Sequence, residues 1–202
     1  MVDIPVLNKD EIIRAEIILS ARELFQRFGL LKTTMEDIAR AAGKGKSTLY
    51  YYYTSKDEIF EAVIQEDMAE VFVQVKKAVE KATTAELKLK AFTLTRLKLL
   101  NQRIALFNIV CGEINDNPAL IRKNKKVYEA QELELLRSIL HFGVQKGEFR
   151  KMEKEDVDNL SFVMLSALRG IERSLLEDSQ MKKMTDRMDL ILNILANGIK
   201  KK

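Results

Sequence analysis

The segment TTMEDIARAAGKGKSTLYYYYTSKDEIF, residues 33–60, decides how the rest of this chain is interpreted. Near its start, Thr34 is positioned to cap a helix, and Asp37 follows three residues later to complete the cap. Apolar side chains then recur at helical spacing, and Gly43 supplies the left-handed conformation that ends a helix. A second short helix begins at Lys46. Two short helices joined by a tight turn that contains glycine predict a helix-turn-helix.

The second of these helices has an outward face that suits nucleic acid. At about 100° per residue, Leu49 and Tyr53 point toward the first helix. The outward face of this helix and the flanks of that face carry hydroxyl groups and one ammonium, from Lys46, Ser47, Thr48, Tyr50, Tyr51 and Tyr52. These groups can bond base edges and phosphate oxygens. The stretch from Arg40 to Lys56 has four basic residues and no acid, a local charge that attracts a polyanion.

The pattern A-G-x-x-K-x-T-L-Y-Y-Y-Y-x-S-K-D-E-I-F, residues 42–60, resembles the DNA-binding signature of the tetracycline-repressor (TetR) family of bacterial regulators. The likeness extends back through residues 18–25 and covers roughly the first 60 residues. It implies that the start of the second helix faces bases, and that Thr34, Tyr52 and Lys56 mainly anchor phosphates. Lys44 stands where the family has an apolar residue, and it adds charge beside the DNA face. The candidate DNA-binding residues are Thr34, Lys44, Lys46, Ser47, Thr48, Tyr50, Tyr51, Tyr52 and Lys56.

An earlier helix completes a three-helix head. The pattern predicts it from about Lys9 to Phe28, ended by Gly29. Its inward stripe is expected to comprise Ile13, Ile17, Ala21, Leu24 and Phe28. We therefore predict an all-α fold with a helix-turn-helix DNA-binding domain over residues 1–55. Residues 56–202 form the second domain, a helical bundle for ligand binding and dimerisation.

The bundle is expected to contain a series of longer helices. One starts after the Ser55 cap and runs to about Glu80, and another starts after Thr84. The others are an apolar helix over residues 104–114, a helix from Pro118 to about Gln145 and a final pair. The apolar stripes of that pair indicate either plain core or a subunit interface, and the family resemblance favours the interface. The candidate interface residues are Leu160, Met164, Leu168, Ile171, Met184, Met188, Ile191 and Leu195.

Bulky apolar residues in the bundle indicate either its core or the wall of a ligand pocket. The resemblance implies a cavity, for which the candidates are Phe92, Leu99, Phe107, Cys111, Tyr128, Leu136 and Phe162. Few polar side chains occur among them. The effector is therefore expected to be an apolar or amphipathic small molecule.

Composition limits the other classes of function. A single cysteine among 202 residues excludes an internal disulfide and fits a reducing compartment. No stretch resembles a secretory signal or a membrane span, so we expect a cytoplasmic protein. No phosphate loop, Cys/His metal cluster or nucleophile–base pair occurs, so no enzyme activity, metal or cofactor is expected. His141 is expected to be structural or exposed, and Glu132 and Glu134 are expected to face water.

The leading hypothesis is a homodimeric repressor that binds a near-palindromic double-stranded operator and is released by a ligand. The alternative is a DNA-binding protein of chromosome organisation or cell division that has the same fold and no effector. A third hypothesis, an α-helical enzyme or lipid carrier, requires the tyrosine-rich helix to be incidental.

Overall fold

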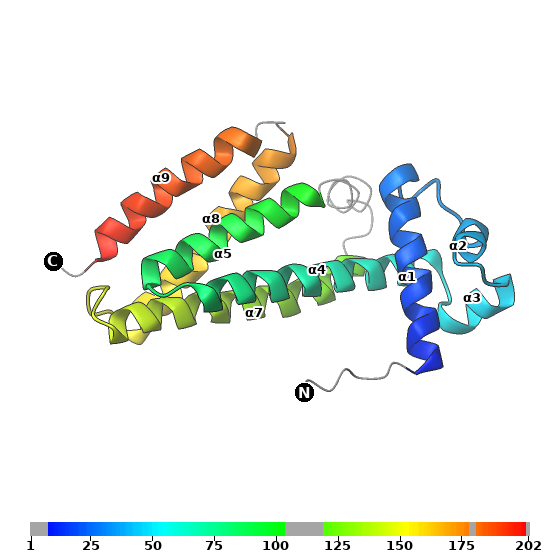
Figure 1. Ribbon diagram of the computed structural model, residues 1–202, viewed down its shortest axis with the longest axis horizontal. Coiled ribbons are helices and arrows are strands. Elements are labelled where there is room, and N and C mark those ends of the chain that lie inside the picture. The colour runs from blue at the N-terminus through cyan, green and yellow to red at the C-terminus, as the bar shows by residue number, and fades with distance from the viewer. Residues whose placement is uncertain (1–7, 104–118, 178–180, 201–202) are drawn as a thin grey trace. The chain divides into compact units, whose positions relative to one another are not determined.

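A computed structural model describes residues 8–103, 119–177 and 181–200 (Figure 1). The regular elements in these ranges are helices, which confirms the all-α fold class. They are α1 (Lys9–Phe28), α2 (Met35–Ala41), α3 (Lys46–Tyr52), α4 (Lys56–Lys81), α5 (Ala85–Gln102), α7 (Ala119–Gln145), α8 (Lys154–Glu177) and α9 (Met181–Ile199). Within the described ranges, no helix has the length and apolar character needed to cross a bilayer.

Local capping chemistry explains most of the helix boundaries. Gly29 ends α1 with φ 84°, and the Thr34 hydroxyl accepts a hydrogen bond from the Asp37 amide at the start of α2. Ser55 and Thr84 accept from amides in the first turns of α4 and α5. These caps are the ones that the sequence predicts. The helix predicted over residues 104–114 and the break before Pro118 lie outside the described residues.

The described residues divide into two compact units, with the division inside α4 after Asp67. The first unit is the head, built on α1, α2, α3 and the first part of α4. The second contains the rest of α4 with α5, α8, α9 and most of α7. The predicted boundary between residues 55 and 56 stays a prediction.

Aromatic packing holds the head together. Phe25 and Phe60 are fully buried and meet edge to face, with their ring centroids 5.3 Å apart. On α1 the buried side chains include Ile17 and Ala21, as predicted, but Phe28 is 48% exposed. The predicted stripe was wrong there because the core-facing side of α1 continues to Phe25 instead. Arg22 of α1 also pairs with Glu66 and Asp67 of α4, at 3.2 and 3.3 Å.

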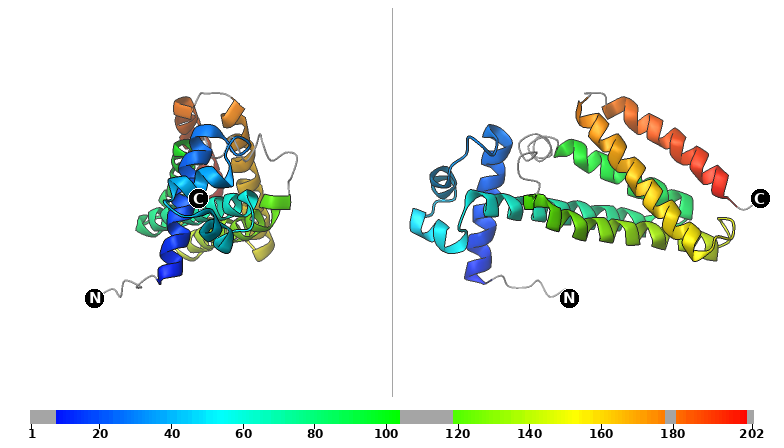
Figure 2. Two further views of the ribbon diagram at one scale, coloured as in Figure 1. Left: turned by 90° about the vertical axis from the view of Figure 1, so that its right-hand side faces the viewer. Right: turned by 180° about the vertical axis from the view of Figure 1, so that it is seen from behind.

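The second unit has its own core, formed mainly by α5, α7 and α8, in which Phe92, Leu136 and Phe149 are fully buried. Helices α8 and α9 run as an antiparallel pair, and α9 packs along α5 (Figures 1 and 2). The Arg150 amide donates to the Ile199 carbonyl at 2.8 Å, which joins the segment before α8 to the end of α9.

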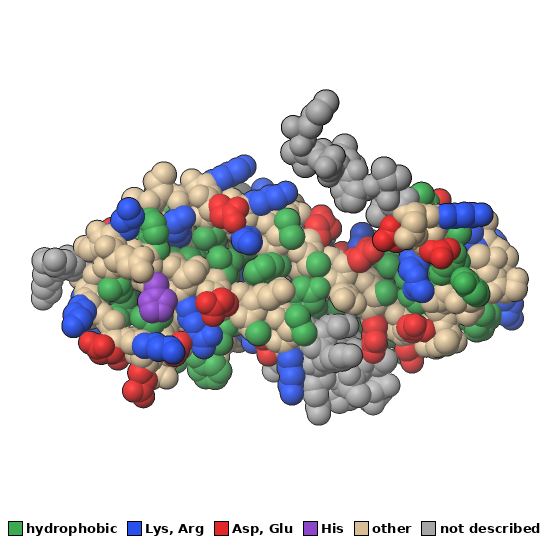
Figure 3. Space-filling model, turned by 90° about the horizontal axis from the view of Figure 1, so that it is seen from below, with side chains coloured by type: hydrophobic (Ala, Val, Ile, Leu, Met, Phe, Trp, Pro, Cys, Tyr) green, Lys and Arg blue, Asp and Glu red, His purple; other side chains and the backbone are tan. Residues whose placement is uncertain are grey.

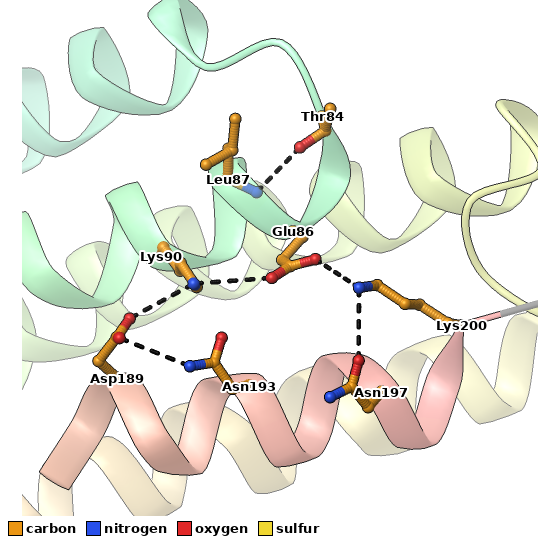
Figure 4. Close-up of polar contacts among 8 residues, drawn as sticks. All are labelled: Thr84, Glu86, Leu87, Lys90, Asp189, Asn193, Asn197 and Lys200. Atoms are coloured by element: carbon orange, nitrogen blue, oxygen red, sulfur yellow. Dashed lines mark hydrogen bonds and ion pairs between the residues drawn. The ribbon is translucent and has the colours of Figure 1, made fainter.

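A polar cluster joins α5 to α9 (Figure 4). Lys200 lies 2.7 Å from Glu86, and Lys90 lies between Glu86 and Asp189 at 3.6 and 3.5 Å. The hydrogen bond from Lys200, together with both ammonium charges, holds the pKa of Glu86 below its ordinary value. The cluster thus fixes α9 against α5 along the edge of the core.

Another ion-pair network crosses α5, α7 and α8. Glu132 accepts from Arg96 at 2.8 Å and from Arg169 at 3.1 Å, and Arg169 also pairs with Glu129. The expectation that Glu132 faces water was therefore wrong, because two arginines from neighbouring helices cover it. Glu134 is exposed, as expected, and Arg137 lies 3.4 Å from its carboxylate. His141 is exposed at the surface, as expected (Figure 3).

Gly143 tests the packing of the second unit. A Cβ at this position would lie 2.2 Å from the buried Phe149 ring and 2.8 Å from the Ala85 Cβ. We expect Gly143→Ala to lower the free energy of unfolding by about 1–3 kcal/mol, as overpacking outweighs the better helix propensity. Urea denaturation followed by circular dichroism measures the change. In the control Gly198→Ala, no atom lies within 4 Å of the new Cβ, and no loss is expected. Equal stability of the two variants would contradict this account.

Candidate nucleic-acid interface

The turn between α2 and α3 has the predicted conformation. Gly43 has φ 63°, a value that side chains with a Cβ rarely adopt. Gly45 occupies the N-cap of α3 in an extended conformation and makes no side-chain cap. The two glycines let α3 start immediately after α2.

Helix α3 has one buried side and one exposed side. Leu49 and Tyr53 are buried, as predicted, and they fasten the helix to the head. On the other side Tyr51 is 77% exposed and Tyr50 is 44% exposed. The remaining outward candidates are Lys46 and Ser47, which are exposed, and Thr48, which is half-buried. The exposed set offers hydroxyls, aromatic rings and one ammonium to a groove.

Both lysines at the start of α3 are engaged by carboxylates from other helices. The Lys44 ammonium lies 2.6 Å from Glu16 of α1, and Lys46 forms an ion pair with Glu36 of α2. The hydrogen bond with Lys46 lowers the pKa of Glu36, and the same bond raises the pKa of Lys46. Sequence reasoning missed both acids. Neither lies within the basic stretch that contains the lysines, and no helical spacing connects them to it.

Tyr52 has a different environment from its neighbours on α3. Its side chain is buried, and its hydroxyl donates to Asp10 of α1 at 2.7 Å. That bond, together with burial, raises the pKa of Tyr52 to about 12. The Arg14 guanidinium lies 5.3 Å from the centroids of the Tyr52 and Tyr53 rings and donates to the Tyr52 carbonyl. These contacts give Tyr52 a role in joining α3 to α1, and a phosphate contact by its hydroxyl would compete with Asp10.

Lys56 likewise has partners inside the head. Its ammonium donates to the carbonyls of Leu30 and Thr33 at 2.7 and 2.9 Å, and it lies 3.5 Å from that of Leu31. These carbonyls belong to the connection between α1 and α2. An ammonium has three N–H donors, so little capacity is left for the predicted phosphate contact. Thr34, in turn, is exposed and uses its hydroxyl to cap α2.

A family model described as "Bacterial regulatory proteins, tetR family" matches residues 17–63 of the chain. The match covers α2, α3 and the turn between them, together with most of α1 and the first turns of α4. The chain carries the DNA-binding domain of the TetR family. It is accordingly a DNA-binding transcriptional regulator, as the resemblance of residues 42–60 implies.

Relatives of this regulator extend the likeness beyond the head. The HTH-type transcriptional repressor KstR2 of Rhodococcus jostii is 27% identical over 142 residues, which cover 68% of each chain. The fatty acid metabolism regulator protein of Bacillus subtilis is 22% identical over 187 residues, covering 93% of this chain and 95% of the relative. The structure of the regulator FadR from Bacillus subtilis in complex with stearoyl-CoA aligns with a TM-score of 0.73 at 22% identity. The alignment covers 92% of this chain and 98% of FadR, and it shows a shared fold.

The candidate interface residues of the regulator fall into two groups. Met164, Leu168 and Met188 are buried in the core of their own chain, and Leu160 and Ile171 pack partly buried against it. Ile191 and Leu195 are exposed, and the side chain of Met184 lies outside the described residues. The interface prediction does not fit the buried group, because those side chains belong to the core of their own chain.

The candidate pocket residues are also divided. Phe92, Leu99 and Leu136 belong to the core cluster. Tyr128 is half-buried, and burial raises the pKa of its hydroxyl. Phe162 is 64% exposed, so it cannot line an interior pocket of its own chain. The inward side of α8 at this level is occupied by Ser161 and Leu165, and Phe162 points away from it. Phe107 and Cys111 lie outside the described residues.

The contacts of Lys56 predict a structural effect. We expect Lys56→Met, which keeps an apolar stem and removes the donors, to lower the stability of the head by about 2 kcal/mol. Four of the five tyrosines lie in α3 and directly after it, and the chain has no tryptophan. Tyrosine fluorescence during urea denaturation therefore reports mainly on the head. The control Lys32→Met removes an exposed charge from the same connection and should leave the stability unchanged.

The opposite outcome for Lys56 is distinguishable. Lys56→Met could instead leave the stability unchanged and reduce the slope of log DNA affinity against log salt by about 1, the value for one phosphate contact. That result would support the predicted phosphate anchor.

Proposed function

We propose that this regulator is a homodimeric repressor that is released from a near-palindromic operator by an amphipathic ligand. The observation that carries the proposal is the exposed side of α3, where Tyr50, Tyr51 and Ser47 stand free of the core. A helix-turn-helix places such a side in the major groove, where base edges are distinguishable. We place this regulator in the cytoplasm and propose no enzymatic activity for it.

The proposed DNA contacts divide by chemistry. Ser47, Thr48, Tyr50 and Tyr51 would meet base edges and the phosphates beside them, and Lys46 would join them after exchange with Glu36. Thr34 and Lys44 would contact the backbone. Tyr52 and Lys56 act mainly by holding α3 and the connection between α1 and α2 in position.

A dimer is supported by an apolar face on α8 and α9. The exposed apolar side chains on this face include Phe162, Val163, Leu190, Ile191, Ile194 and Leu195. On α9 these side chains form one stripe, at spacings of one, three and four residues. On α8, Ser166, Ala167 and Gly170 continue the exposed side and allow close approach by another helix. Two such helix pairs from two copies form a four-helix bundle.

The relatives suggest the chemistry of the effector. One is a fatty acid metabolism regulator, and the FadR structure contains stearoyl-CoA. A long-chain acyl thioester is amphipathic, which agrees with an apolar helical body. A ligand that prefers the conformation in which the two heads no longer match the half-site spacing would release DNA by population shift. The relatives give no support to the alternative role in chromosome organisation.

Selection of bound duplexes from a random pool tests this function. We expect an enriched site with two inverted half-sites, and we expect stearoyl-CoA to release the protein from that site. Fluorescence anisotropy of the labelled duplex measures the release, and free coenzyme A serves as the control. Failure to enrich any sequence would overturn the proposed operator. An enriched site from which no acyl-CoA releases the protein would overturn only the proposed effector.

The apolar face predicts a mutation that separates folding from assembly. Ile194 is 63% exposed, so Ile194→Glu should leave the monomer folded and prevent dimers, because the symmetric interface would contain the buried charge twice. Sedimentation and circular dichroism on the same sample measure both properties. Met188→Glu should instead unfold the chain, because Met188 is buried in its own core.

Val127→Glu provides the matched control for Ile194→Glu. Val127 is an exposed apolar residue on α7, a helix that does not contribute to the face on α8 and α9, and its substitution should leave the dimer intact. A fully dimeric Ile194→Glu protein would show that this face is not the interface.

A further inference from the structure

The two lysines at the start of α3 are not free to meet DNA in the unbound head. Lys44 is held by Glu16, and Lys46 is held by Glu36. We propose that Glu16 and Glu36 are specificity-determining residues that suppress binding to arbitrary DNA by occupying these two lysines. The inference rests on the proposed docking of α3 in the major groove.

The two ion pairs are products of the tertiary fold. Lys44 lies in the turn between α2 and α3, and Lys46 lies in the first turn of α3. Their carboxylate partners belong to α1 and α2, the two helices that position α3 within the head. Each carboxylate is about half exposed, so a phosphate can displace it without unfolding the head. The pairs are therefore present before DNA arrives and are exchanged when it binds.

The charge of the head as a whole supports this interpretation. Residues 1–60 contain nine basic and nine acidic residues, so the head has no net positive charge to attract a polyanion. Several other cations in the head are also engaged. Lys56 bonds backbone carbonyls, Arg22 pairs with carboxylates of α4, and Arg14 lies over two tyrosine rings. Release of Lys44 and Lys46 would therefore give the exposed side of α3 two ammonium groups that can bind phosphate.

The exchange has different consequences on arbitrary DNA and on the operator. Arbitrary DNA is bound almost entirely through phosphate contacts, and each contact contributes a counterion-release term to the salt dependence. A lysine that must leave a carboxylate to reach a phosphate exchanges one ionic partner for another and gains little. On the operator, base contacts by α3 add about 1–3 kcal/mol each and offset the loss of the internal pair. The carboxylates therefore weaken arbitrary binding more than operator binding.

The test replaces each acid by its neutral isostere. We expect Glu16→Gln and Glu36→Gln each to tighten binding to a random-sequence duplex roughly fivefold at moderate salt. The slope of log affinity against log salt should steepen by about 0.9, the value for one additional phosphate contact. Operator affinity should increase less, so the ratio of operator to random affinity falls. Anisotropy titrations at several salt concentrations measure all three quantities, and circular dichroism verifies that the variants are folded.

Two controls separate release of a lysine from a simple change in net charge. Glu23→Gln removes one negative charge from α1, seven residues after Glu16, where the described residues show no ion pair for Glu23. It should change random-DNA affinity much less. In a Lys46→Gln background, Glu36→Gln should have no more effect than Glu23→Gln, because the lysine that it would release is absent.

The outcomes discriminate between this inference and the proposed function. Glu16→Gln and Glu36→Gln proteins that bind random DNA like Glu23→Gln would overturn the inference and leave the proposed function intact. The same effect of Glu36→Gln with and without Lys46 would overturn it for that pair. A wild-type protein that binds neither random nor selected DNA would overturn both.

Discussion

The geometry of the head depends on the hydrogen bonds that the Lys56 ammonium donates to the carbonyls of Leu30 and Thr33. It ties the first turn of α4 to the connection between α1 and α2. That connection sets where α2 starts, and α2 with its glycine turn sets where α3 emerges. The bond from Tyr52 to Asp10 then fastens the end of α3 to α1. The exposed side of α3 is therefore oriented by polar contacts at both ends of the motif, in addition to the apolar packing beneath it.

Local rules were sufficient to predict the helices of the head. The cap made by Thr34 and Asp37, the left-handed Gly43 and the end of α1 at Gly29 each depend on residues within one helical turn. The register of a long helix against its core is harder to predict, as Phe28 illustrates, because Phe25 and Phe28 both fit a stripe of spacing three and four. The choice between them depends on Phe60, which the periodicity of α1 does not contain.

The sequence was sufficient to predict most of the residues of α3 that are exposed. It was not sufficient to predict which side chains pair with Lys44 and Lys46. The helical wheel points Ser47, Thr48 and Tyr51 outward. In the structure Ser47 and Tyr51 are exposed, and Thr48 is half-buried. The acids that hold Lys44 and Lys46 come from other helices, so only the folded head brings them together. In the bundle, an apolar stripe could not distinguish a core from an interface. Met188 and Ile191 lie within one turn of α9, yet one is buried and the other is exposed.

The backbone bridge between Phe149 and Lys200 has a mechanical consequence for the second unit. It closes the base of the α8–α9 hairpin, and the contacts of α9 with Glu86 and Lys90 brace its length. A helical hairpin that is joined at its open end resists separation of its two helices, so α8 and α9 keep their relative position. The apolar face that spans them is therefore already formed in the single chain.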